Sequence, residues 1–183
     1  MIYQKTTDMV QIKKCTFEHM TKSYPCKEKS VLDGCMIMRQ SIKPEDVQSP
    51  FQVEAYALLF CISGEVNIIS DLRSYTVTPG TLFVYLPNNI IKIDCKKESI
   101  ISEVILASDY LRKNFLQWNK ISPLFIQTAN NPVITIPTDR RDELIRMLDN
   151  IQERIKTATC SEWNRKAYHA ALKTFLYDII SLA

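Results

Sequence analysis

Between residues 35 and 107 the chain is a succession of short β-rich runs, and this pattern constrains its fold more than any other feature. The runs are separated by turn sequences such as Ser63-Gly64 and Pro79-Gly80. Short strands at this regular spacing favour a barrel or a sandwich. The strand candidates are CMIMRQSI (35–42), VEAYALLFCI (53–62), EVNIIS (65–70), SYTV (74–77), TLFVYL (81–86), IIKID (90–94) and ISEVILA (101–107).

The length and composition are those of one globular domain with a real core. The chain has 183 residues, of which 46% are hydrophobic and 23% are charged. Its longest apolar run, AYALLFCI at 55–62, is far shorter than the roughly 20 residues of a membrane helix. The N-terminal sequence has no apolar stretch before a cleavage site, so we expect a cytoplasmic protein without a membrane partner. Only three glycines occur, and two of them, Gly64 and Gly80, fall at turns where a positive φ is expected.

Beyond residue 107 the apolar residues follow a helical period. Ser108 is a candidate cap for a short helix near 109–118, and PVITI at 132–136 predicts one more strand. Two long amphipathic helices follow, with Thr138 and Ser161 as their expected N-caps. Joined by a short loop, they predict an αα-hairpin whose apolar surface is covered by the barrel, by a partner, or by both. The apolar seam of the first helix is formed by Leu144, Leu148, Ile151 and Ile155.

The ionisable side chains give no sign of metal, redox or nucleic-acid chemistry. The six cysteines show no CxxC spacing, which in a reducing cytosol indicates free thiols. The 23 basic and 20 acidic residues are scattered without a basic stripe, so DNA binding by this segment itself is not indicated. The two histidines, His19 and His169, lie outside the strand region and are expected to be packing or surface residues.

Residues 51–93, FQVEAYALLFCISGEVNIISDLRSYTVTPGTLFVYLPNNIIKI, resemble the cupin-type sensor domain of AraC-family bacterial transcription regulators. The helices that follow resemble the dimerisation hairpin of that family, and ISGE, YTVTPGTLFVYLPN and the helical tail occur in the family's order. The resemblance implies an α+β fold, a cupin-like (jelly-roll) β-barrel followed by a C-terminal antiparallel helical hairpin. The divisions expected from it are an N-terminal arm with the first strands over 1–34, the barrel over 35–137, and dimerisation helices over 138–183.

The metal ligands of a metal-dependent cupin are missing from the sequence. In such proteins two motifs supply histidines and a glutamate, which an approximate alignment places near 50–53, Ala57 and Lys92. None of these positions holds a histidine, and a zinc or iron site needs three or four converging ligands. We therefore expect no metal, no cofactor and no enzymatic activity, and a barrel that holds a small molecule without transforming it.

Strand alternation gives candidate ligand-binding residues but does not say which face of each strand is inside. Each candidate also has a purely structural interpretation, as a half-buried strand tyrosine, an edge charge or one partner of a surface ion pair. By resemblance, part of residues 1–30 is a mobile arm that contacts the ligand. The candidates are Arg39, Tyr56, Tyr85, Lys92 and Glu103.

The leading hypothesis is a sensing and dimerisation module of an AraC-like regulator. It binds an unknown small-molecule effector and forms a homodimer through Leu144, Leu148, Ile151 and Ile155. DNA is reached only through a C-terminal helix-turn-helix domain, and the chain stops at LYDIISLA, about where the linker to that domain would begin. It is either a truncated piece or a natural short form. The alternatives are a metal-dependent cupin enzyme and an interaction module whose barrel is filled by side chains.

Overall fold

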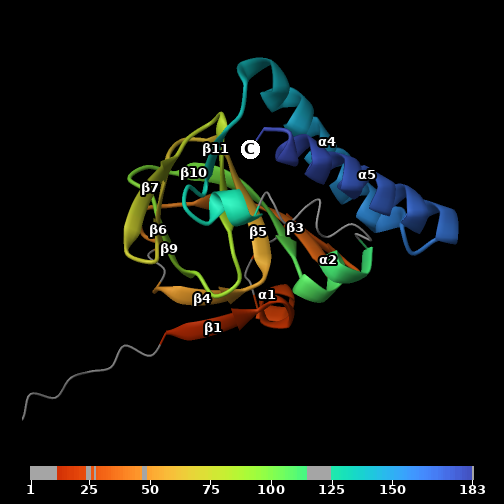
Figure 1. Ribbon diagram of the computed structural model, residues 1–183, viewed down its shortest axis with the longest axis horizontal. Helices are drawn as coiled ribbons and strands as arrows, with labels where there is room; N and C mark the ends of the chain where they lie inside the picture. The colour runs from red at the N-terminus through yellow and green to blue at the C-terminus, as the bar shows by residue number, and fades with distance from the viewer. Residues whose placement is uncertain (1–11, 24–25, 27, 47–48, 115–124, 183) are drawn as a thin grey trace, which may run out of the picture.

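The computed structural model describes residues 12–23, 26, 28–46, 49–114 and 125–182 (Figure 1). The helices are α1 (Phe17–Ser23), α2 (Ser108–Asn114), α4 (Thr138–Thr157) and α5 (Glu162–Ile180). The strands are β1 (Lys13–Thr16), β2 (Glu28–Leu32), β3 (Cys35–Ile42), β4 (Phe51–Glu54), β5 (Tyr56–Ser63), β6 (Val66–Ser70), β7 (Arg73–Val77), β8 (Thr81–Tyr85), β9 (Ile90–Asp94), β10 (Ser99–Leu106) and β11 (Val133–Thr135).

The strands form two sheets that enclose a core. Sheet A has the order β1-β4-β9-β6-β7, and sheet B has the order β11-β8-β5-β10-β3-β2. Eight of the strands pair from the outside inwards along the sequence, the first with the last and the second with the second last. The antiparallel pairs are β3–β10, β4–β9, β5–β8 and β6–β7. This arrangement of eight strands in two sheets is a jelly roll. The predicted α+β fold, a jelly-roll barrel followed by two helices packed against each other, is confirmed.

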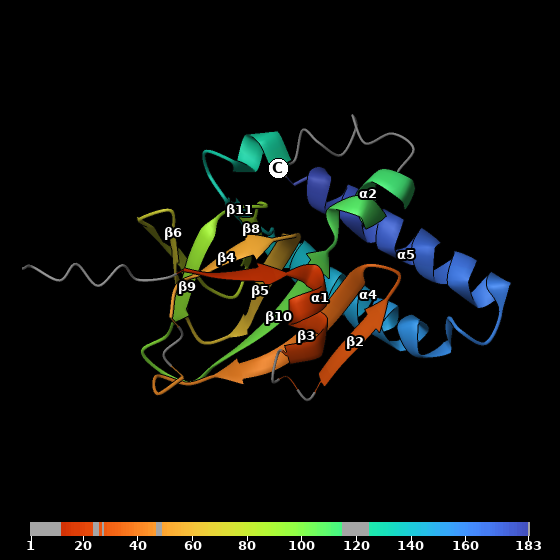
Figure 2. The same ribbon diagram turned by 90° about the horizontal axis from the view of Figure 1, so that it is seen from below.

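The strand β5 is apolar without interruption because both of its faces are buried. Ala57, Leu59 and Cys61 point between the sheets, whereas Leu58 and Phe60 point towards the helices on the outer face of sheet B. The chain therefore has two apolar cores, one inside the barrel and one between sheet B and the hairpin. Figure 2 shows α4 and α5 lying along the same side of the barrel. The buried side chains inside the barrel include Met36, Met38, Leu59, Phe83, Tyr85, Ile91 and Ile105.

The single strand expected over 53–62 is in fact two strands in different sheets. β4 ends at Glu54 and belongs to sheet A, and β5 begins at Tyr56 and belongs to sheet B. The chain bends at Ala55, which is fully buried. Periodicity alone cannot reveal this crossing, because an apolar run continues through a bend when both sides of it are buried.

The long helices form the expected hairpin, and their N-caps differ from one another. The backbone N–H of Asn164 donates to Ser161 Oγ at 3.0 Å, so Ser161 caps α5 as predicted. The prediction for Thr138 is wrong, because Pro137 occupies the N-cap position of α4 and makes no side-chain cap. The backbone carbonyl of Pro137 accepts from the N–H groups of Arg140 and Arg141 instead.

The four residues predicted to form the dimer contact are buried inside the single chain. Leu144, Leu148, Ile151 and Ile155 are between 0 and 6% exposed, and they pack in the core between the hairpin and sheet B. Their burial against sheet B does not fit a role at a surface, so the prediction that these four side chains form a dimer contact is corrected. The sequence pattern identified a buried seam correctly but not what buries it.

Gly64 and Gly80 both have the expected positive φ, of 84° and 102°, but their surroundings differ. A Cβ on Gly64 would clash with Ser99 Oγ and lie 2.9 Å from Ser99 Cα, whereas the nearest described atom to one on Gly80 is the Ile136 carbonyl oxygen at 4.0 Å. We expect Gly80→Ala to lower the free energy of unfolding by about 1–2 kcal/mol through backbone strain alone. Gly64→Ala adds a clash with backbone and should lower it by roughly 3 kcal/mol or more. Urea denaturation of both variants checks this, and equal losses would contradict it.

Candidate functional site

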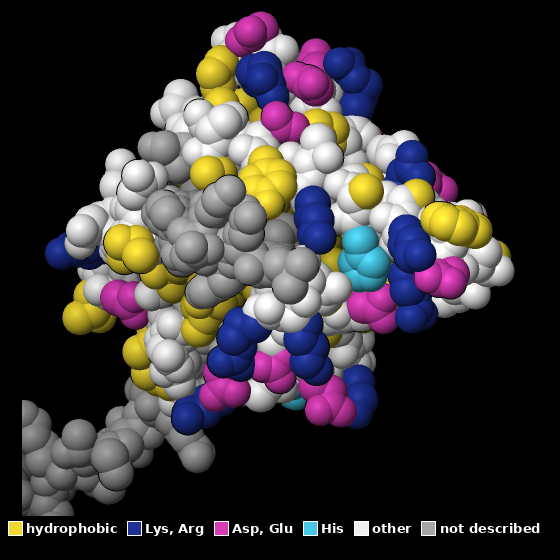
Figure 3. All heavy atoms as spheres, turned by 45° about the vertical axis from the view of Figure 1, so that its right-hand side comes forward, with side chains coloured by type: hydrophobic (Ala, Val, Ile, Leu, Met, Phe, Trp, Pro, Cys, Tyr) yellow, Lys and Arg dark blue, Asp and Glu magenta, His cyan; other side chains and the backbone are white. Residues whose placement is uncertain are grey.

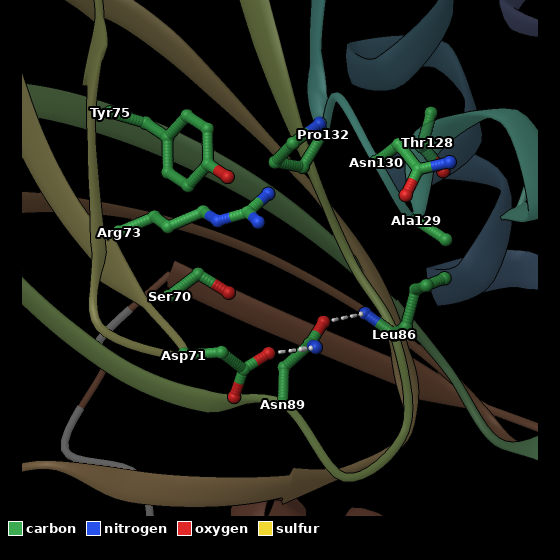
Figure 4. A pocket seen from close by; sticks show the side chains of 10 residues that line it. All are labelled: Ser70, Asp71, Arg73, Tyr75, Leu86, Asn89, Thr128, Ala129, Asn130 and Pro132. Carbon is green, nitrogen blue, oxygen red and sulfur yellow. Dashed lines mark hydrogen bonds between the residues drawn. The ribbon is translucent and has the colours of Figure 1, made fainter.

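A hollow of about 280 Å³ opens at the seam between the two sheets (Figure 4). One wall comes from β7, the edge strand of sheet A, and the turn before it. The opposite wall comes from the segment that leads into β11, the edge strand of sheet B. We call this site the seam hollow. Its lining residues are Ser70, Asp71, Arg73, Tyr75, Leu86, Asn89, Thr128, Ala129, Asn130 and Pro132.

Arg73 and Tyr75 reach the seam hollow side by side because they are two residues apart on the same strand. Figure 4 shows both side chains extending from β7 towards Pro132. The turn that starts β7 has positive φ at Asp71 (47°) and Leu72 (70°), and this conformation joins two antiparallel strands closely. The guanidinium of Arg73 is exposed and has no ion pair or side-chain hydrogen bond within the described part of the chain.

The wall of the seam hollow around Leu86 is held in place by hydrogen bonds to the side chains of Asp71 and Asn89. Asn89 Nδ2 donates to Asp71 Oδ2 at 2.6 Å, and the backbone N–H of Ile90 donates to Asp71 Oδ1 at 2.9 Å. The backbone N–H of Leu86 donates to Asn89 Oδ1 at 2.7 Å (Figure 4). Both oxygens of the Asp71 carboxylate thus accept hydrogen bonds from other groups, and neither pairs with the guanidinium of Arg73.

Two of the predicted ligand residues, Tyr85 and Glu103, lie together inside the barrel. Glu103 is on the same face of β10 as Ile101 and Ile105 and is 3% exposed. Burial raises the pKa of its carboxyl to about 8, and a hydrogen bond with the Tyr85 hydroxyl opposes this rise. Its Oε2 atom has no hydrogen-bond partner among the residues that the structure describes. A neutral carboxyl is therefore the favoured form in the apolar interior at pH 7.

The other three predicted ligand residues lie outside the barrel. Arg39 is on the helix-facing side of β3 and pairs with Asp149 of α4, with Nη2 and Oδ1 2.7 Å apart. Tyr56 faces the second core, where its ring centroid is 4.4 Å from that of Phe125. Lys92 alternates with the interior Ile91 and Ile93, so its side chain points to the outer side of sheet A. The structure does not bring these three together with Tyr85 and Glu103.

A chain of aromatic contacts joins the seam hollow to the barrel interior. The ring centroid of Tyr75 is 5.3 Å from that of Phe83, and Phe83 is 5.1 Å from Tyr85. Tyr85 in turn contacts Glu103. Strand alternation predicted Tyr85 and Glu103 at the inner end of this chain but not the residues at its outer end, Ser70, Arg73, Tyr75 and Asn130. The only signal for them was an arginine alternating with a tyrosine beside a turn, and this pattern is common on strands that face solvent.

Both histidines lie outside the barrel. His19 is in α1, and His169 is in α5, where its Nδ1 atom lies 2.9 Å from the Tyr110 hydroxyl. Asp33, in the β2–β3 turn, lies 3.5 Å from His169 Nε2, but burial outweighs this carboxylate and lowers the pKa of His169. Within the described ranges no three His, Cys, Asp or Glu side chains are grouped so as to hold a metal ion. In the same part of the chain, no helix is both long and apolar enough to span a membrane.

The arrangement of the two sheets agrees with that of cupin domains, which are jelly rolls of this kind. The chain has a cupin-like fold. It matches no protein-family model and no curated protein sequence. Among solved structures, it is similar to the EutQ protein of Clostridium difficile, a cupin superfamily protein of Desulfitobacterium hafniense and a cupin-2 domain protein of Shewanella frigidimarina.

These similarities are partial. The sequence identities to the three proteins are 17, 18 and 10%, and the TM-scores are 0.35, 0.41 and 0.39. The aligned parts cover 41, 43 and 48% of this chain and 58, 72 and 87% of the respective proteins, so the chain spans less than two thirds of the length of EutQ. The nested strand pairing of the chain itself remains the basis of the fold assignment.

Proposed function

We propose that the chain is a small-molecule sensing module of the kind found in AraC-like regulators, which binds its effector in the seam hollow without transforming it. The observation that carries this proposal is the convergence of Ser70, Arg73 and Tyr75 from sheet A with Asn130 from the opposite wall, around an open volume. A few directed polar groups on a partly apolar wall are typical of small-molecule sites.

The seam hollow is connected to the hairpin by a short covalent route. Its wall at Thr128–Pro132 leads into β11, and α4 begins three residues after β11 ends. This route is anchored to the barrel by the pairing of β11 with β8 and by two flanking backbone hydrogen bonds. Val84 N donates to the Pro132 carbonyl at 2.8 Å, and Ile136 N donates to the Gly80 carbonyl at 2.7 Å. An effector that contacts this wall favours one position of the segment, and thereby one arrangement of the hairpin.

The proposed output is pairing of two chains through the outer face of the hairpin. On this face Trp163 is 75% exposed and Tyr177 is 47% exposed. Between the helices Met147 and Ala171 border a shallow depression of about 240 Å³. Figure 3 shows basic and acidic side chains interspersed on this side of the molecule. A surface of mixed charge favours contact with a second copy of the chain over contact with a polyanion. In this proposal DNA is reached only through an additional domain.

A thermal-shift screen of sugars, organic acids and lipids tests the sensing role. A compound at 100 times its dissociation constant adds about 2.7 kcal/mol to stability, which corresponds to a rise in melting temperature of about 5–10 °C for a chain of this size. The matched variants are Ala129→Trp, which fills the seam hollow, and Lys96→Trp, which adds the same ring at an exposed turn.

We expect the rise to disappear in Ala129→Trp and to persist in Lys96→Trp. If no compound stabilises the protein, or if Ala129→Trp responds as the unaltered chain does, the proposal is wrong. Chemical conversion of a bound compound, abolished by Ala129→Trp, would replace sensing with catalysis.

A further inference from the structure

We infer that the seam hollow selects small organic anions, and that Arg73 binds their carboxylate group. This inference rests on the proposed function and adds to it the chemical class of the ligand. It depends on three features of the hollow: the unpaired guanidinium of Arg73, the hydroxyl groups beside that guanidinium, and the apolar wall opposite.

The guanidinium of Arg73 is available to a ligand because the one acidic side chain among the described lining residues is hydrogen-bonded elsewhere and does not pair with it. Asp71 accepts hydrogen bonds from Asn89 Nδ2 at 2.6 Å and from the backbone N–H of Ile90 at 2.9 Å. Arg73 is the only basic residue among the described residues of the lining, and no other described residue pairs with its guanidinium. A guanidinium presents two parallel N–H donors that match the two oxygens of a carboxylate.

The polar neighbours of Arg73 are able to donate to the same anion. Ser70, 7% exposed, directs its hydroxyl into the hollow, and the hydroxyl of Tyr75 lies beside the guanidinium (Figure 4). Neither hydroxyl group carries a charge that would repel an anion. Opposite them, Leu86 and Pro132 offer an apolar surface for the remainder of the ligand. The volume of about 280 Å³ is at the lower limit for ligand pockets, so the ligand is a small molecule with one anionic end.

A larger hollow elsewhere in the molecule has no unpaired guanidinium among its described lining residues. A hollow of about 450 Å³ lies between β2, β3 and α4, but its Arg39 is already paired with Asp149, with Nη2 and Oδ1 2.7 Å apart. Its Lys156 is paired with Glu153, with Nζ and Oε1 2.6 Å apart, and its Lys29 donates to the Thr21 carbonyl at 2.9 Å. Its third carboxylate, Glu28, opposes the binding of an anion. The comparison favours the seam hollow as the anion site.

The test is binding of benzoate, with benzamide as the neutral molecule of the same shape and inorganic phosphate as an anion without an apolar part. Isothermal titration calorimetry measures the affinities of the full chain. Shifts of the backbone amide signals of Ser70, Arg73 and Tyr75 locate the site. The first variant, Arg73→Met, removes the positive charge but keeps most of the length of the side chain. Its matched control is Lys92→Met, which removes one positive charge from the outer side of β9 in sheet A.

We expect benzoate to bind more tightly than benzamide or phosphate and its affinity to fall as salt rises. Arg73→Met should weaken benzoate binding about tenfold to a hundredfold, Arg73→Lys should weaken it less, and Lys92→Met should change it less than about twofold.

Equal binding of benzamide and benzoate at the hollow, or unchanged benzoate binding by Arg73→Met, would overturn the anion inference and leave the proposed sensing role standing. Tighter binding of phosphate than of benzoate would show a general anion site and reject the organic class. If neither these probes nor any compound of the thermal-shift screen binds, both the inference and the proposed function fail.

Discussion

Leu148→Asp is expected to disrupt the packing of the helical hairpin on the barrel and to lower the free energy of unfolding by about 5 kcal/mol or more. Leu148 is 1% exposed and lies in the core between α4, α5 and sheet B. The substitution removes a buried side chain, which by itself costs about 2–5 kcal/mol. It also places a carboxylate in an apolar core without a partner, at a further cost of several kcal/mol. Urea denaturation followed by circular dichroism measures the loss.

Met147→Asp is the matched control, because it adds the same carboxylate one residue earlier on the same helix. Met147 is half-buried and borders the depression on the outer face of the hairpin. We expect this variant to remain folded and, if two chains pair there, to sediment as a monomer at concentrations where the unaltered chain pairs. A folded Leu148→Asp chain with unchanged stability would show that the α4 seam is not the core described above. Unchanged pairing of Met147→Asp would place the contact elsewhere.

Glu103→Gln is expected to stabilise the protein at pH 8 by about 3–5 kcal/mol and to change its stability little at pH 4.5. The ordinary pKa of a glutamate is 4.5, and burial raises that of Glu103 to about 8. The folded state therefore retains a proton that the unfolded state releases between these two values. The contribution of Glu103 to stability is fully present below pH 4.5 and is lost as the pH rises towards 8. Glutamine preserves the shape of the neutral carboxyl and removes this dependence.

The measurement is the difference in unfolding free energy between the unaltered chain and the variant, from urea denaturation at pH values from 4.5 to 8.5. Because other groups titrate in the same range, the difference between the two proteins is the relevant quantity, not either curve alone. Glu45→Gln removes a carboxylate from the exposed surface and should give a difference that is flat with pH. A flat difference for Glu103→Gln as well would mean that Glu103 ionises in the folded protein as it does in the unfolded chain.

Local residue patterns alone identified the strands after residue 35, their turns and the hairpin, but not the bounds of β1 and β2. Alternation, turn residues and the helical period are properties of neighbours along the chain, and they placed β3, β6, β8 and β9 within a residue of their observed bounds. Gly64 and Gly80 were assigned a positive φ for the same reason, since a turn imposes its backbone geometry locally. The strand expected over 53–62 was misread because the bend at Ala55 lies inside the core, where no glycine or proline marks it.

The sequence by itself determined which side chains lie on the same face of a strand or helix. Only the tertiary structure decided which of the two faces is buried. Alternation grouped Ile37 with Arg39 and Ile101 with Glu103, but sheet packing put the first pair towards the helices and the second in the barrel. The seam hollow likewise exists only because β7 and the segment before β11 meet, although more than fifty residues separate Arg73 from Asn130. Local propensity acts over a few residues, whereas the stacking of two sheets depends on burial summed over the whole chain.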